Sequence, residues 1–157
     1  MKTLFASLML LLTTSVFSQY ITLDVSYYRA ENDHNRSTRT EKFSISGYTS
    51  SYSIDYTGRS MPNEIDEVKN CELSTAALGS ITKSIEDNKI SRDESIYAKE
   101  RTVGEGLFYI VVSVKLVYNG VATEILLDGE SNLIMENKAY RDVIALIKDL
   151  RKIIRDC

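Results

Sequence analysis

The chain has 157 residues, with 19 lysines and arginines against 22 aspartates and glutamates, so its formal net charge at pH 7 is −3. A slight acidic excess argues against a general nucleic-acid-binding protein, which usually carries a basic surplus. Hydrophobic residues make up 43% of the chain, which is enough for one domain with its own core.

Residues 1–18 have the pattern of a secretory signal peptide. Lys2 gives a basic start, residues 4–12 are almost wholly apolar, and Val16 and Ser18 precede an expected cleavage point. The apolar run is shorter than the roughly 20 residues that a membrane-spanning helix needs. We therefore expect residues 19–157 to be one exported domain, secreted or periplasmic, with no membrane span.

The first half of this domain is expected to contain three strands. Apolar and polar side chains alternate over residues 20–29, 43–47 and 52–57, which is typical of half-buried strands. Residues 30–41 are almost entirely polar and predict a long exposed connection. Strands separated by turn residues favour an antiparallel meander.

A loop and then a helix are expected next. Residues 58–72 contain the only proline of the chain and predict a loop that crosses the domain. Ser74 is the expected N-cap of a helix, with Leu73 and Leu78 placed for a hydrophobic staple. Apolar residues continue at helical spacing to Ile85, so one face of this helix is expected to be buried.

Two further strands and a weaker one follow. Residues 95–103 predict the weak strand, and residues 107–118 predict a central strand covered on both faces, because its first half is apolar at both parities. Asn119-Gly120 is the best type I′ hairpin signal in the chain. A two-residue turn there would place Lys115 opposite Glu124, a favourable cross-strand pair.

The last element is expected to be an amphipathic helix over about residues 137–156. Its two faces are apolar (Val143, Leu146, Ile147, Leu150, Ile153 and Ile154) and basic (Lys148, Arg151, Lys152 and Arg155). The order of elements predicts an α+β fold, an antiparallel sheet of about five strands with two helices packed on one face.

Cys71 and Cys157 are the only cysteines. An even count in an exported protein predicts one disulfide between them. A free thiol and an intermolecular bridge through Cys157 are the alternatives.

Catalytic and metal motifs are weak. His34 is the only histidine and lies in a polar run with Glu31 and Asp33, which is more typical of a solvated loop than of a base or a metal site. Ser80 and Lys83 match a Ser-x-x-Lys spacing without its companion motifs. We assign no catalytic residue, no metal ligand and no cofactor.

Three other patterns have ordinary explanations. Residues 128–132 resemble the start of a calcium loop, but Leu133 and Ala139 occupy positions that require Gly and Glu. The basic face of the last helix is expected near a helix C-terminus. Asn35 begins a glycosylation sequon.

Tyrosines are concentrated in the N-terminal half of the domain. Tyrosine offers rigid amphipathic area and is enriched at interfaces. We therefore predict a partner site formed by some of Tyr28, Tyr48, Tyr52 and Tyr56, rather than by the C-terminal helix.

The leading hypothesis is a non-catalytic exported binding or interaction module for a protein, glycan or small molecule, and not for nucleic acid. One alternative is a small hydrolase that uses paired carboxylates. Another is an inhibitor or immunity-type protein, in which residues 30–41 or 57–72 enter the site of another protein.

Overall fold

The computed structural model of the chain describes residues 20–31, 37–58, 66–98 and 108–157. Its strands are β1 (Thr22–Glu31), β2 (Thr38–Ser46), β3 (Thr49–Thr57), β4 (Glu67–Glu72), β5 (Glu94–Ala98), β6 (Phe108–Tyr118) and β7 (Val121–Glu130). Its helices are α1 (Thr75–Asp87), α2 (Ser131–Met135) and α3 (Lys138–Arg155).

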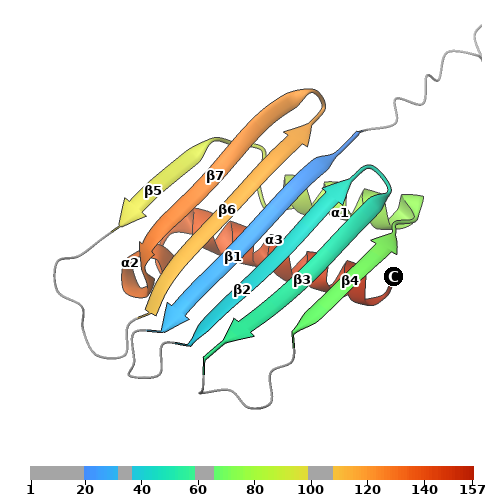
Figure 1. Cartoon of the computed structure of the whole chain (residues 1–157). Helices are drawn as coiled ribbons and strands as arrows, with labels where there is room; N and C mark the ends of the chain where they lie inside the picture. Colours follow the sequence, from blue (N-terminus) through green and yellow to red (C-terminus); the bar gives the residue numbers. More distant parts are fainter. Residues whose placement is uncertain (1–19, 32–36, 59–65, 99–107) are drawn as a thin grey trace, which may run out of the picture.

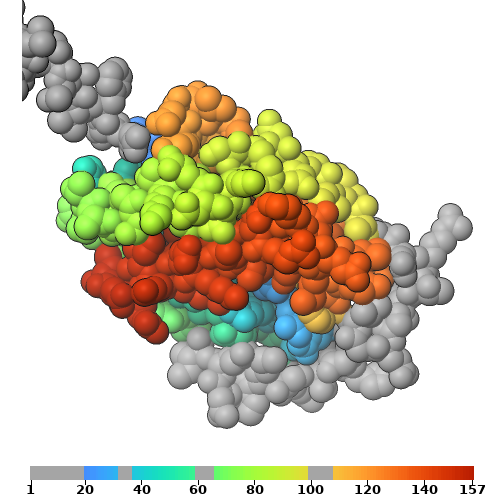
Figure 2. Space-filling model, turned by 180° about the vertical axis from the view of Figure 1, so that it is seen from behind, coloured from blue at the N-terminus to red at the C-terminus, as the bar shows by residue number. Residues whose placement is uncertain are grey.

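The described strands form one sheet in the order β4-β3-β2-β1-β6-β7-β5 (Figure 1). All neighbours are antiparallel except β5, which is parallel to β7. Helices α1 and α3 lie side by side across one face of this sheet (Figure 2). The fold is therefore α+β, as the sequence predicts.

The core lies between the sheet and these two helices. On the central strand β1, Leu23, Val25 and Tyr27 alternate into it, and so does Ile21 just before the strand; all four are at least 92% buried. This confirms the alternation read from residues 20–29, because every second side chain of a strand points to the same face.

The sheet is larger than expected, with seven strands in the described residues rather than about five. β4 lies where we expected only a loop. Its sequence shows no apolar alternation, because it is an edge strand with most side chains exposed, and its backbone pairing with β3 defines it. The short β5 forms the opposite edge.

The expected connection over residues 30–41 is also shorter than predicted. Residues 38–41 belong to β2 and pair with both β1 and β3. Because their side chains are polar, no apolar alternation in the sequence indicated a strand here. One of these side chains, Glu41, is nevertheless fully buried.

β6 is central, between β1 and β7, but only its helix-facing side is fully buried. Ile110, Val112 and Val114 are in the core, whereas Val111 and Ser113 on the other side are half-buried.

The Asn119-Gly120 hairpin is confirmed. Both residues have positive φ, 52° and 76°, as a type I′ turn requires. Tyr118 pairs with Val121, and Lys115 lies opposite Glu124 with 3.7 Å between charged atoms.

Local capping sets where the two long helices begin. The Ser74 side chain accepts a hydrogen bond from the Ala77 amide, and Asn137 accepts one from the Ala139 amide, so each satisfies an otherwise unpaired helical N–H. A bond of 2.6 Å from the Ser84 hydroxyl to Asp149 joins α1 to α3.

The predicted disulfide is present. Cys71 of β4 is bonded to Cys157, 86 positions later and just beyond α3. It ties the end of the helix to the edge of the sheet, at the end where α1 also begins (Figure 1).

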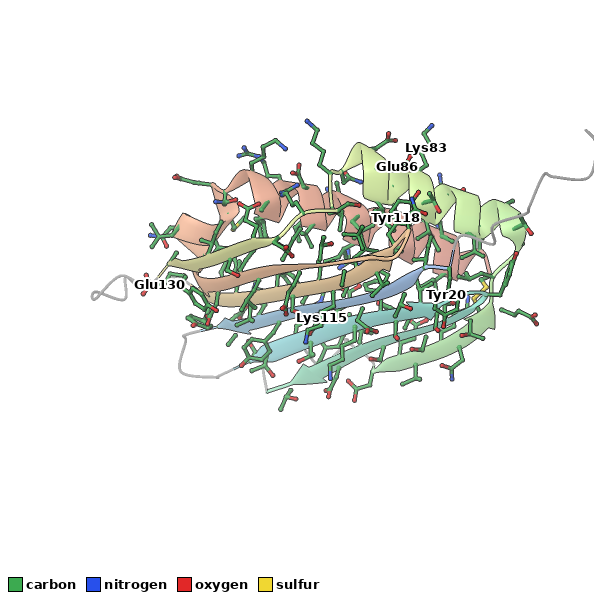
Figure 3. All side chains as sticks on the ribbon, turned by 90° about the horizontal axis from the view of Figure 1, so that it is seen from above. Tyr20, Lys83, Glu86, Lys115, Tyr118 and Glu130 are labelled. Carbon is green, nitrogen blue, oxygen red and sulfur yellow. A yellow bond between two sulfur atoms is a disulfide. The ribbon has the colours of Figure 1, made fainter. Side chains whose placement is uncertain are left out.

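We call the side of the sheet without these helices the open face. Side chains on alternate positions point to it, including Asp24 and Lys115 on paired positions of β1 and β6. Figure 3 shows Lys115 on the opposite side of the sheet from α1 and α3.

Candidate functional site

A cleft opens between the C-terminal half of α3 and the strands β3 and β4. It has a volume of about 450 Å³ and is lined by Tyr52, Glu67, Lys69, Lys148, Arg151, Lys152, Ile154 and Arg155. We call it the basic pocket, because five of these eight side chains are cationic.

The helical repeat of α3 explains the basic side of the pocket. Val143, Ile147, Leu150 and Ile154 are buried against the sheet. Lys148, Arg151, Lys152 and Arg155 are exposed on the remaining surface of the same turns, so the helix that closes the core also carries the cations.

Arg151, one of the residues that line the pocket, belongs to an ion cluster around a buried carboxylate. Glu41 of β2 has no exposed surface and accepts hydrogen bonds from Arg151 through both of its oxygens, with 2.5 Å between Nε and Oε1. Arg39 donates a further bond of 3.0 Å to the same carboxylate. Glu41 shares its face of β2 with Phe43 and Ile45, so it occupies a core position and needs these partners.

Two cations therefore share one carboxylate in this cluster. The Arg151 hydrogen bonds with Glu41 raise the pKa of the guanidinium against the effect of burial. Arg151 uses Nε and Nη2 for Glu41, and its side chain keeps 41% of its surface exposed.

Tyr52 contributes both an aromatic ring and a phenol hydroxyl to the pocket. Its ring lies 4.9 Å from that of Phe43, centroid to centroid, in a tilted arrangement. Burial, followed by the charge of Glu41, raises the pKa of its phenol to about 12. The phenol is therefore neutral at physiological pH.

The opposite wall is β4. The Lys69 ammonium donates a hydrogen bond of 3.1 Å to the Arg155 carbonyl at the end of α3. The Cys71–Cys157 disulfide bridges the same two elements. Strand and helix end are thus tied together by one covalent and one polar link.

Positive charge is in excess among the described residues that line the pocket. Its lining contains Lys69, Lys148 and Lys152, none of which forms an ion pair with a described residue, and Glu67 is its single acidic member. Arg155 only approaches Asp156, at 3.8 Å, and both are exposed. The chain as a whole is acidic, so this clustering is local.

The four tyrosines of the predicted partner site do not come together. Tyr28 points to the open face, Tyr48 lies in the β2–β3 turn, and Tyr52 and Tyr56 point towards α3. Tyr52 alone lines the basic pocket. The involvement of Tyr28, Tyr48 and Tyr56 in binding stays a prediction.

The weak catalytic motifs divide between described and undescribed residues. His34, Asp33 and Asn35 lie outside the described residues. Glu31 is engaged by Arg29 and Ser37, and the Ser80 hydroxyl donates to the Ala76 carbonyl of its own helix.

No group of three or more His, Cys, Asp or Glu side chains that could hold a metal occurs within the described residues. No described helix is long and apolar enough to cross a membrane. No protein-family model matches the chain, and no curated protein is found to be similar to it.

Sequence reasoning found the cations of α3 but not the pocket. Lys69, Glu67 and Glu41 were missed, because each comes from a region that we expected to be a loop. One signal was available for Glu41: it stands two and four positions before Phe43 and Ile45, in phase with buried residues.

Proposed function

We propose that this protein is a non-catalytic, exported binding module that takes up a small anionic ligand in the basic pocket. One observation carries the proposal: five cations and one carboxylate line a cleft of about 450 Å³. Ligand sites usually fall in the range of about 300–1,000 Å³.

The side chains fit phosphate or carboxylate groups. Lysines without ion-pair partners provide mobile point charges, and a guanidinium provides directed N–H donors. Because Glu41 holds Arg151 in place, that donor is positioned before the ligand arrives, which reduces the ordering cost of binding. Tyr52 adds a neutral ring beside the charges.

The pocket favours binding over hydrolysis by paired carboxylates. Among the described residues, Glu67 is the only carboxylate that lines the pocket, and the nearby Glu41 is bound by two arginines. A general acid and base pair would need two carboxyl groups facing one substrate.

Export is part of the proposal and rests on two observations. Residues 1–18 have the pattern of a signal peptide. The Cys71–Cys157 disulfide is of the kind that persists in oxidising compartments.

Thermal unfolding with and without inorganic phosphate, pyrophosphate or citrate tests the pocket. A ligand that binds only the folded state raises the melting temperature. We expect at least one probe to do so for the wild type, and the effect to weaken with added sodium chloride, which screens the exposed lysines.

Two charge-reversed variants locate the effect. Lys148→Glu/Lys152→Glu should weaken binding by at least about tenfold. Lys42→Glu/Lys83→Glu changes the net charge equally at exposed sites outside the pocket and should bind as the wild type does. Equal losses in both pairs, or no response of the wild type to any probe, would contradict the proposal.

A Tyr28→Ser/Tyr48→Ser variant compares the pocket with the tyrosine hypothesis. Neither residue lines the pocket, so this variant should retain the response to the anionic probe. Loss of that response here, but not in Lys148→Glu/Lys152→Glu, would assign binding to the tyrosines instead.

A further inference from the structure

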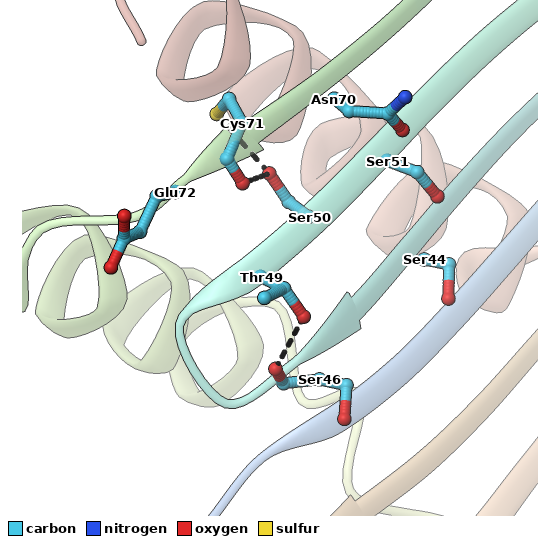
Figure 4. A pocket seen from close by; sticks show the side chains of 8 residues that line it. All are labelled: Ser44, Ser46, Thr49, Ser50, Ser51, Asn70, Cys71 and Glu72. Atoms are coloured by element: carbon cyan, nitrogen blue, oxygen red, sulfur yellow. Dashed lines mark hydrogen bonds between the residues drawn. The ribbon is translucent and has the colours of Figure 1, made fainter.

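A second concavity lies on the open face, around the β2–β3 turn and the edge strand β4. Its volume is about 560 Å³, and its lining consists of Ser44, Ser46, Thr49, Ser50, Ser51, Asn70, Cys71 and Glu72 (Figure 4). We call it the hydroxyl hollow. Ser50 and Cys71 point to the helix side, where Ser50 is buried and donates a hydrogen bond to the Cys71 carbonyl. The other six residues lie on the open face, and four of them are serine or threonine.

Strand register brings the polar side chains together. Ser44 pairs with Ser51, and Ser51 pairs with Asn70, so three polar side chains form a row across β2, β3 and β4. Ser46 and Thr49 begin the next row towards the turn. Adjacent strands are about 4.8 Å apart, so each row is a ladder of hydrogen-bonding groups with a spacing comparable to the length of a sugar ring.

The first row is available to a ligand. No side-chain hydrogen bond joins Ser44, Ser51 or Asn70 to another group of the described residues. Thr49 donates to the Ser46 carbonyl at 2.9 Å, which leaves the lone pairs of its hydroxyl as acceptors. Hydroxyl and amide groups can both donate and accept, which suits a ligand made of hydroxyls.

Tyr20 adds an aromatic side chain beside the hollow. Its hydroxyl is hydrogen-bonded to that of Ser46 at 3.0 Å. Its ring packs beside Gly47 of the turn, 3.7 Å from where a Cβ would lie. The residue is nevertheless 62% exposed, so one edge of the ring is in contact with the turn while the rest of the side chain is accessible to solvent. Tyrosine provides rigid amphipathic contact area at low entropic cost.

We propose that the hydroxyl hollow and Tyr20 bind a neutral carbohydrate chain. The hydroxyl and amide ladder would pair with sugar hydroxyls, and the Tyr20 ring would cover the apolar C–H face of one sugar. No cation lines the hollow among the residues that the structure describes, and Glu72 would repel an anion, so the ligand chemistry differs from that of the basic pocket. The position of the hollow at the β4 edge lets a chain extend beyond the sheet.

Isothermal titration calorimetry with maltohexaose, cellohexaose and chitohexaose tests this site on the full mature protein. We expect at least one of these neutral hexasaccharides to bind. Ser44→Ala/Ser51→Ala/Asn70→Ala should weaken that binding by at least about tenfold, because three hydrogen-bonding groups are lost. Tyr20→Ala should weaken it as well, through loss of the ring.

Ser26→Ala/Thr40→Ala/Ser53→Ala is the matched control, because these residues lie on the open face outside the hollow. It should bind as the wild type does.

Absence of binding of all three hexasaccharides at millimolar concentration would overturn the proposal, and so would equal affinity of the hollow and control variants. Loss of binding in Lys148→Glu/Lys152→Glu would place the sugar in the basic pocket and would also overturn it. Because these probes are uncharged, a failure of the hexasaccharides to bind would not affect the separate test of anion binding in the basic pocket.

Discussion

Glu41 and Arg151, 110 positions apart in the sequence, form a hydrogen-bonded ion pair beneath α3. The carboxylate is fully buried, whereas the arginine side chain keeps 41% of its exposure. The pair therefore joins the core of the sheet to the wall of the basic pocket. It sets the position of α3 over β2 as well as the direction of the guanidinium.

Glu41→Gln should destabilise the protein by about 3 kcal/mol. The substitution keeps the shape of the side chain but leaves Arg39 and Arg151 without their shared anion, and breaking one partner of a buried pair is costly. The free energy of unfolding in urea measures this.

Glu67→Gln is the control for that loss. Glu67 is an exposed carboxylate of the same pocket, and surface substitutions usually stay within about 0.5 kcal/mol. If Glu41→Gln proves no more destabilising than Glu67→Gln, the ion pairs of Glu41 do not stabilise the fold.

Gly129→Ala should destabilise the β5 edge. A Cβ at this position would lie 2.0 Å from the Ala98 carbonyl oxygen of the parallel strand β5, so the strands must separate. Overpacking of this kind costs about 1–3 kcal/mol. Hydrogen exchange of the amides of β5 should become faster than in the wild type.

Gly79→Ala provides the opposite case in the same protein. Gly79 lies in α1, and nothing is within 4 Å of its added Cβ. Replacing a helical glycine with alanine should stabilise the protein by about 0.5–1 kcal/mol. Destabilisation by Gly79→Ala, or no destabilisation by Gly129→Ala, would contradict these two expectations.

The disulfide should stabilise both the fold and the pocket. The chain-entropy relation gives roughly 4–5 kcal/mol for a closed loop as long as the one between Cys71 and Cys157, and measured effects are often smaller. Cys71→Ser/Cys157→Ser should therefore lower the midpoint of urea unfolding. It should also weaken anion binding, because β4 carries Lys69 and the bond holds β4 to the end of α3.

A reductant separates this effect from the substitutions themselves. It should lower the stability of the wild type towards that of the double serine variant and leave the variant unchanged. Intact mass of the unfolded, unreduced protein should show no alkylation. Uptake of two alkyl groups would mean that the cysteines are not bonded in the mature protein.

Asp142 should contribute to the acid sensitivity of the fold. Burial tends to raise its pKa, but hydrogen bonds from Lys138 and Arg92 outweigh this effect and lower the pKa below its ordinary value. A carboxyl group with a lowered pKa in the folded state stabilises it above the ordinary value, about 3.9, and this contribution disappears as the pH falls.

Asp142→Asn tests that sign. The wild type should be the more stable protein at pH 7, and the difference in the free energy of unfolding should shrink towards pH 3. A difference that is constant over this range would show that the charge of Asp142 is not responsible.

The parts of the fold that were predictable depend on neighbouring residues. Ser74 caps α1 through an amide three positions away, and Asn119-Gly120 sets the register of β6 and β7 through its own backbone angles. The disulfide was predictable for another reason: a chain with two cysteines has a single possible intramolecular pairing.

The parts that were missed depend on distant partners. β4 has no apolar pattern and exists because β3 offers it an edge. Tyr52 and Tyr56 of β3 lie on the helix side of the sheet, whereas Tyr28 of β1 lies on the open face. Alternation along a strand could not predict on which side of the sheet the helices would pack.

The sequence by itself determined the type and approximate limits of the long helices, the β6–β7 hairpin and the cysteine pairing, because these follow from local backbone preferences and from counting. Only the tertiary structure decided that the cations of α3 face Lys69 of β4 and stand over Glu41 of β2. A periodic pattern states which side of an element is polar. Which other elements meet that side depends on strand order and helix packing, and these are set by contacts between residues far apart in the chain.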